Sequence, residues 1–136
     1  EVYYRTHVAH VNTVGRNFYS DHKLLETIYE YFQDNIDTLA EKLRTIRAQM
    51  PVDLDMVLTT SSVVDVPTVG DSRSLLESVE EALEAMIDQY HLLYEAAEEI
   101  KYVDISNFAQ DQIGQLAKLR WMLEATLGSM DEPEDD

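Results

Sequence analysis

Apolar residues recur along most of the chain at intervals of three and four positions, the spacing of one face of an α-helix. The longest such stripe predicts a helix over residues 20–50. We expect this helix to end before Pro51, because the residue preceding a proline avoids helical backbone. Its apolar positions are Leu25, Ile28, Phe32, Ile36, Leu39, Leu43, Ile46 and Met50.

The same periodicity predicts three further helices, over residues 2–14, 71–101 and 106–127. A turn around Gly15 places the first helix antiparallel to the second. The segment Ser74–Glu77 has the pattern of a capping box, with Asp71 and Ser72 as alternative N-caps. Gly128 is placed to stop the last helix.

The long connection over residues 51–70 shapes the predicted topology. It is rich in β-prone residues and too long for a simple helix hairpin, so it can cross the length of a bundle. The predicted class is therefore an all-α, ferritin-like four-helix bundle with one long crossover between the second and third helices. We expect one bundle domain over residues 1–130, with a short first helix, and a disordered acidic tail over 131–136.

Composition narrows the choice of partners. The chain has 136 residues, 45% of them hydrophobic, with 27 acidic and 10 basic residues and a net charge of −17. A surface this acidic repels nucleic acid and anionic membranes and suits metal cations. There is no cysteine, which excludes disulfides and thiolate metal sites. No membrane span or targeting signal is evident, so we expect a cytoplasmic protein without a membrane partner.

Two histidines flank the predicted turn, His10 before it and His22 after it. A stripe of carboxylates then follows His22 at helical spacing. Imidazole and carboxylate together suit Fe(II) and related divalent ions, although a solvated helix face is the plainer interpretation of such a charge run. The stripe comprises Glu26, Glu30, Asp34, Asp37 and Glu41.

Helix length divides this stripe into two halves. Fifteen positions separate Glu26 from Glu41, which at about 1.5 Å per residue is about 22 Å along the helix. One subunit therefore cannot close both halves around one metal ion. Two copies of the helix packed antiparallel about a two-fold axis can do so, and they would create two identical sites with ligands from both chains.

These residues also resemble a known signature. The run from Ala9-His10 through Gly15-Arg16-Asn17-Phe18 and His22 to Asp37-Thr-Leu-Ala-Glu41-Lys42 is similar to that of the Dps-type miniferritins, which are ferritin-like proteins. The similarity continues to the last helix, at Asp111 to Leu127. It covers nearly the whole chain, including the long crossover.

The resemblance implies a ferroxidase function linked to oxidative stress. Its iron ligands would be His10, His22 and Glu26 from one subunit and Asp37 and Glu41 from its two-fold partner. The implied reaction is oxidation of Fe(II) by hydrogen peroxide or oxygen, with storage of ferric iron inside a hollow homo-oligomeric shell, a dodecamer in that family. Iron is the one cofactor implied, as a di-iron or mononuclear centre at the subunit interface, and no organic cofactor is expected.

Further residues are candidates for supporting roles. His7 lies three positions before His10 and is either an extra ligand or a surface or interface histidine. Asp104, Asn107 and Asp111 follow helical spacing at the start of the last helix. In a shell of this family that region lines three-fold pores, so these residues would form an acidic entry path for Fe(II). The plainer alternative is a capping residue and two exposed polar groups.

Two other functions remain open. A metal-binding shell or scaffold without competent oxidation is favoured by Val11, where the family usually has Trp, and by the short first helix. A DNA-protecting binder is disfavoured by the net charge of −17 and by the lack of a basic arm.

Overall fold

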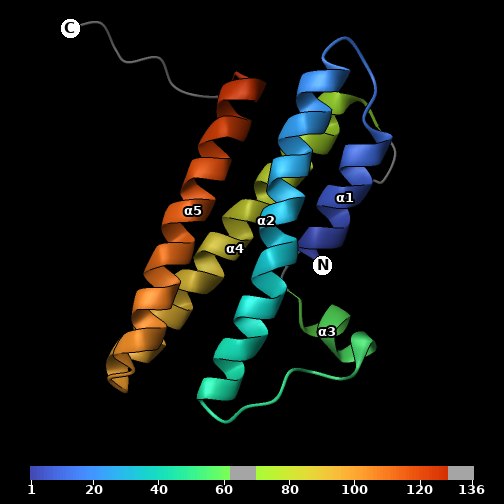
Figure 1. Cartoon of the computed structure of the whole chain (residues 1–136). Helices are drawn as coiled ribbons and strands as arrows, with labels where there is room; N and C mark the ends of the chain where they lie inside the picture. Colours follow the sequence, from blue (N-terminus) through green and yellow to red (C-terminus); the bar gives the residue numbers. More distant parts are fainter. Residues whose placement is uncertain (62–69, 129–136) are drawn as a thin grey trace, which may run out of the picture.

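The architecture of the chain is all-helical. The computed structural model describes residues 1–61 and 70–128, and within those ranges it contains helices and no strand. The predicted fold class is therefore confirmed (Figure 1). The helices are α1 (Val2–Asn12), α2 (Phe18–Thr45), α3 (Leu54–Thr60), α4 (Ser72–Glu99) and α5 (Val103–Leu127).

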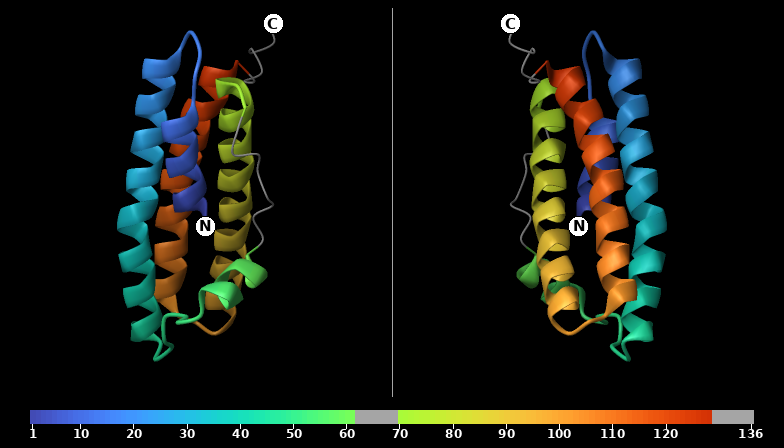
Figure 2. Two further views of the ribbon diagram at one scale, coloured as in Figure 1. Left: turned by 90° about the vertical axis from the view of Figure 1, so that its right-hand side faces the viewer. Right: turned by 90° about the vertical axis from the view of Figure 1, so that its left-hand side faces the viewer.

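Three long helices run the length of the bundle, and the short α1 covers part of it. α4 and α5 pack against each other as an antiparallel pair, and α2 lies alongside them. α1 runs antiparallel to α2 and contacts both α2 and α4, beside one half of the bundle (Figure 2). α2 and α4 both begin at the end near the α1–α2 turn, so the end of α2 and the start of α4 lie at opposite ends of the bundle, as the predicted crossover requires.

The core is built from one apolar stripe of each long helix. Leu25 and Ile28 of α2, Leu83 of α4 and Leu116 of α5 are fully buried. Burying a side chain of this size contributes about 1.5–3 kcal/mol to the free energy of folding. The stripes were predicted from spacing, and their buried residues form one cluster that extends from Leu75 and Leu76 near the start of α4 to Phe108 near the start of α5.

Two polar pairs are enclosed in this apolar interior. The Asn35 amide donates a hydrogen bond to the Tyr90 hydroxyl over 3.0 Å, and the Tyr31 hydroxyl donates to the Gln112 side chain. Burial raises the pKa of both phenols. Because unpaired buried polar groups are costly, these pairs favour one axial register of α2 against α4 and α5.

The end of α2 differs from the prediction. The helix ends at Thr45, five residues before Met50, so Pro51 does not terminate it. Arg47 takes a left-handed backbone with φ 66°, and the N–H of Ala48 bonds the carbonyl of Leu43 over 2.9 Å, which closes a Schellman motif. Ile36, Ile46 and Met50, predicted to face inward, are 46%, 42% and 52% exposed. Ile46 and Met50 come after the end of α2, and Ile36 borders a cavity that is also lined by Val2 and Tyr3 of α1.

Other boundaries are corrected or confirmed. The connection contains the unpredicted helix α3, whose N-cap Asp53 accepts a hydrogen bond from the backbone of Asp55 over 3.0 Å. Asp71 is the N-cap of α4, and Gly128 ends α5 in a left-handed conformation with φ 69°. α5 begins at Val103, earlier than predicted.

Two predictions concern segments that the structure describes only in part or not at all. Residues 62–69 of the connection and the tail over 131–136 fall outside the described residues. Among the helices that are described, none is long and apolar enough to cross a membrane.

Candidate metal centre

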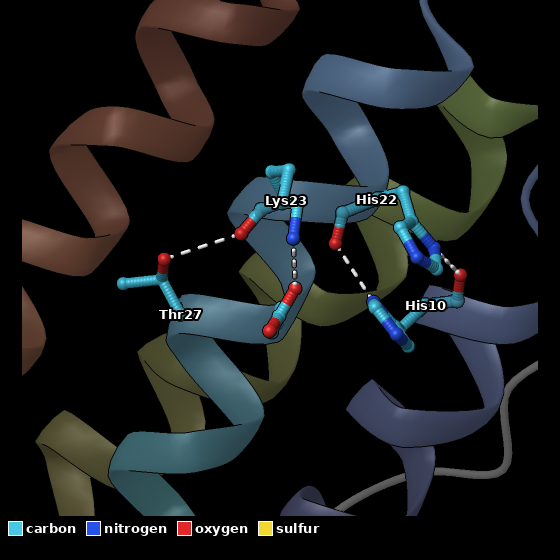
Figure 3. A network of polar contacts seen from close by, with 5 residues as sticks. His10, His22, Lys23 and Thr27 are labelled. Carbon is cyan, nitrogen blue, oxygen red and sulfur yellow. Dashed lines mark hydrogen bonds and ion pairs between the residues drawn. The ribbon is translucent and has the colours of Figure 1, made fainter.

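The α1–α2 turn brings the two predicted histidines face to face. Gly15 in this turn has φ 127°, a backbone conformation that side-chain-bearing residues rarely adopt. His10 at the end of α1 is buried, and His22 in α2 is half-buried. The Nδ1 of His10 donates to the carbonyl oxygen of His22 over 2.7 Å, and the Nδ1 of His22 donates to that of His10 over 2.6 Å (Figure 3).

This reciprocal pair fixes the chemistry of both rings. A carbonyl oxygen can only accept a hydrogen bond, so each Nδ1 carries the proton. In the neutral tautomer the lone pair then resides on Nε2, which is the state that a metal ligand requires. The two rings stack with centroids 3.6 Å apart and an interplanar angle of 17°.

Aromatic side chains surround the histidine pair. Phe18 stacks on His22 with centroids 5.0 Å apart, and Tyr29 contacts His10 edge-on at 5.0 Å. The His7 ring stacks on the Tyr29 ring with centroids 4.4 Å apart, and the Nδ1 of His7 lies 3.5 Å from the Tyr3 hydroxyl. The His7 ring centroid is 6.0 Å from that of His10. His7 therefore borders the histidine pair and is engaged by tyrosines. Sequence reasoning missed Tyr29, although its position one turn beyond Glu26 is compatible with this contact.

Glu26 supplies a carboxylate one helical turn beyond His22. Its Oε2 lies 3.0 Å from the Nζ of Lys23 (Figure 3). The hydrogen bond from Lys23 holds the pKa of the Glu26 carboxyl below its usual value, and the nearby His10 and His22 act in the same direction. Glu26 is thus ionised at neutral pH and already pairs with a cation.

The other two predicted ligands lie far along the same helix. Asp37 and Glu41 are exposed and lie in the second half of α2. In residues 1–61 and 70–128 of one chain, no group of three or more His, Asp or Glu side chains is placed to hold a metal ion. The structure therefore brings His10 and His22 together and leaves Asp37 and Glu41 apart from them.

The candidate pore residues lie on another helix, α5. Asp104 lies in the first turn of α5, and Asn107 and Asp111 follow on the same helix. All three side chains are exposed. They have the accessibility that an entry path requires, and their pore role remains a prediction.

Comparison with known proteins identifies the family. The sequence matches the ferritin-like domain family over residues 1–132. The chain belongs to the ferritin-like family. Its relatives within that family are Dps-type miniferritins, as the histidine and carboxylate motif predicted. The ferritin-like fold is confirmed with it.

Two curated relatives carry the name DNA protection during starvation protein. The one from Helicobacter pylori is 29% identical over 93% of this chain and 88% of its own length. The one from Brevibacillus brevis is 25% identical over 93% of this chain and 85% of its own length.

Solved structures agree with this assignment. A Dps protein from Bacillus brevis superposes with a TM-score of 0.87 at 25% identity, covering 93% of this chain and 85% of its own. Antigen TpF1 from Treponema pallidum superposes with a TM-score of 0.85 at 28% identity, covering 92% and 81%. The chain is thus similar in sequence and in fold to a family of iron-binding miniferritins.

Proposed function

We propose that this protein oxidises Fe(II) at sites shared between two subunits and stores the ferric product inside a homo-oligomeric shell. The observation that carries the proposal is the reciprocal His10–His22 pair beside the Glu26 carboxylate. The two imidazoles, together with the Glu26 carboxylate one helical turn beyond His22, are donor types that suit Fe(II). Membership of the iron-binding miniferritins supports the same metal.

The shared site follows from the position of the remaining ligands. Asp37 and Glu41 lie on the same helix as Glu26 and are exposed, so they are accessible to a second copy. An antiparallel pairing of two α2 helices about a two-fold axis would place these carboxylates opposite the histidines of the partner chain. We propose this dimer as the unit of a larger shell, a dodecamer as in the Dps family, and an acidic path at Asp104 and Asp111 for iron entry.

In this site the protein binds and orients the substrate iron. The Nε2 atoms of His10 and His22 would bind Fe(II) from one side, and the carboxylates would bind it and offset its charge. Two Fe(II) ions, one hydrogen peroxide and two water molecules yield two ferric oxyhydroxide units and four protons. Each iron gives one electron to the peroxide, whose O–O bond breaks. Oxygen is the alternative oxidant. Holding two irons together lets the peroxide take both electrons at once, without release of a radical.

The test combines solution mass with turnover. Light scattering gives the number of subunits, and Fe(II) with hydrogen peroxide is then added to the same sample. A shell that consumes peroxide as Fe(II) is oxidised is the expected result. The double variant Asp37→Ala/Glu41→Ala should abolish fast oxidation. Glu30→Ala/Asp34→Ala removes two exposed carboxylates of the same stripe and serves as the control, so loss of oxidation in both variants, or in neither, would exclude this site.

A binding shell without oxidation is the second candidate. Val11, beside His10, is 63% exposed and brings no aromatic ring to the site, in contrast to the Trp usual in the family. A protein that binds Fe(II) but leaves peroxide unconsumed would support this candidate and reject the ferroxidase proposal.

A further inference from the structure

We infer that Lys23 is a tethered competitor of the metal ion at Glu26. The ammonium would occupy the carboxylate when no metal is bound and would have to leave before Fe(II) can bind it. The inference rests on the proposed function, because it names what sets the affinity of that same site. It depends on the position of Lys23, which is not one of the proposed ligands.

The first observation is direct contact. Lys23 Nζ lies 3.0 Å from Glu26 Oε2, three positions apart on one face of α2. The same ammonium lies 5.9 Å from the ring centroid of Tyr19, one turn earlier. An aromatic face attracts a cation, so Tyr19 helps to keep the ammonium over this part of the helix.

The second observation is that the three proposed ligands are not held equally firmly. His10 and His22 each hold the other through a backbone carbonyl, so their rings are fixed before any metal arrives. Glu26 is held by a flexible, half-exposed lysine side chain. Of these three proposed ligands, Glu26 is therefore the one whose availability depends on breaking an ion pair.

Electrostatics gives the direction of the effect. A divalent ion bound by Glu26 would lie close to Lys23 Nζ, and two positive charges at such a distance repel each other. The lysine has to swing into solvent, which its exposure permits. Metal binding then gives up the ion pair, so Lys23 lowers the affinity of the site. The cost is modest, because exposed ion pairs are weak.

The test is calorimetric titration of the assembled protein with Co(II), a divalent ion that binds imidazole and carboxylate without being oxidised under these conditions. Lys23→Gln should bind Co(II) about two- to tenfold more tightly than the wild-type protein. Lys23→Arg keeps the charge and should show no such gain. Raising the salt concentration from roughly 0.05 to 0.5 M should shrink the difference between wild type and Lys23→Gln, because salt screens an exposed pair.

Matched controls separate local competition from a general charge effect. Lys118→Gln removes one positive charge from α5 and should leave the Co(II) affinity at the wild-type value. In a Glu26→Gln background, Lys23→Gln should have no effect. Equal or weaker binding by Lys23→Gln in the Glu26 protein would overturn the inference and indicate that Lys23 positions the carboxylate. If no variant binds Co(II), the proposed metal site itself is refuted.

Discussion

The two ends of α2 lie beside different proposed ligands, histidines at one end and carboxylates at the other, and the fold holds them differently. At the first end, α1 packs against α2, and His10 and His22 are fixed by each other's backbone. At the other end, α1 is absent, and Asp37 and Glu41 extend from an exposed helix surface. One end is organised by folding of the single chain, and the other presents its groups outward.

This difference shows how a chain can encode half of a site. Burial and reciprocal hydrogen bonds order the histidines as the single chain folds, so their geometry exists in the monomer. The exposed carboxylates gain no such order from the fold. If the proposed dimer forms, they acquire a defined geometry through assembly, and metal binding reports on the oligomer rather than on the subunit.

The largest expected effect comes from removing one ligand at each end. His22→Ala and Asp37→Ala should each lower the rate of Fe(II) oxidation by about 100-fold or more, because each removes a proposed ligand. His22→Ala should also lower the midpoint of thermal unfolding, since it removes the hydrogen bond from the His22 ring to the carbonyl of His10 and the stacking of the two rings. Asp37→Ala should leave that midpoint within experimental error. Equal loss of stability in both variants would contradict the contrast between the ends.

Core truncations should reveal the same contrast in stability. Leu25→Ala, at a fully buried position beside the histidine pair, should cost about 2–5 kcal/mol of unfolding free energy. Leu39→Ala, at a half-buried position near the other end, should cost less than about 2 kcal/mol, because less apolar contact is lost. Urea titration of both variants measures the difference, and equal costs would show that the uncovered end is packed as tightly as the other.

The buried phenols give a smaller effect that depends on pH. Burial raises the pKa of Tyr31 and Tyr90 above the unfolded value of about 10. Their contribution to stability is therefore complete below pH about 10 and is lost as pH rises through the folded values. Tyr90→Phe should cost about 1–3 kcal/mol at neutral pH, because the buried Asn35 donor loses its acceptor, and it should flatten the alkaline decline.

The control for this prediction is Tyr19→Phe, since Tyr19 is exposed and its hydroxyl is hydrated in both states. Its unfolding curve should match the wild type at every pH. An unchanged alkaline slope in Tyr90→Phe would show that Tyr90 does not contribute to the decline.

No effect at all is expected when DNA is added. Neither end of the bundle offsets the net charge of −17, and twelve copies would carry about −204, so phosphate contacts are unfavourable. A gel shift at low magnesium and physiological salt should leave DNA migrating freely. Retention of the DNA would contradict this prediction and would extend to this chain the property that its relatives' names describe.

The helices themselves were predictable, whereas some of their ends were not. The periodic stripes identified α1, α2, α4 and α5, because burial of an apolar face dominates helix formation in a bundle. α2 and α4 end in left-handed residues that are Arg47 and Lys101 rather than glycine, and these positions carry no sequence signal. The end of α5 does have glycine, at Gly128, and was placed correctly. α3 escaped prediction because its short segment is β-prone.

The site could be predicted to a similar depth. Spacing alone placed His10 opposite His22 across the turn, since two antiparallel helices joined by a short turn have one natural register. Spacing also separated Glu26 from Asp37 and Glu41. The contacts of Lys23 and Tyr29 could not be foreseen, because they depend on side-chain rotamers and on the rotation of α1 about its own axis.

Because α2 is one continuous helix, its length fixes the spacing between the proposed ligands at its two ends. In the proposed dimer, the number of residues between the histidine end and the carboxylate end sets both the distance and the angle between the two symmetric sites. Each inserted residue would lengthen the helix by about 1.5 Å and turn one end by about 100° relative to the other. Point substitutions can accumulate along this stretch, but an insertion or deletion between Glu26 and Asp37 would disable both sites in a single step.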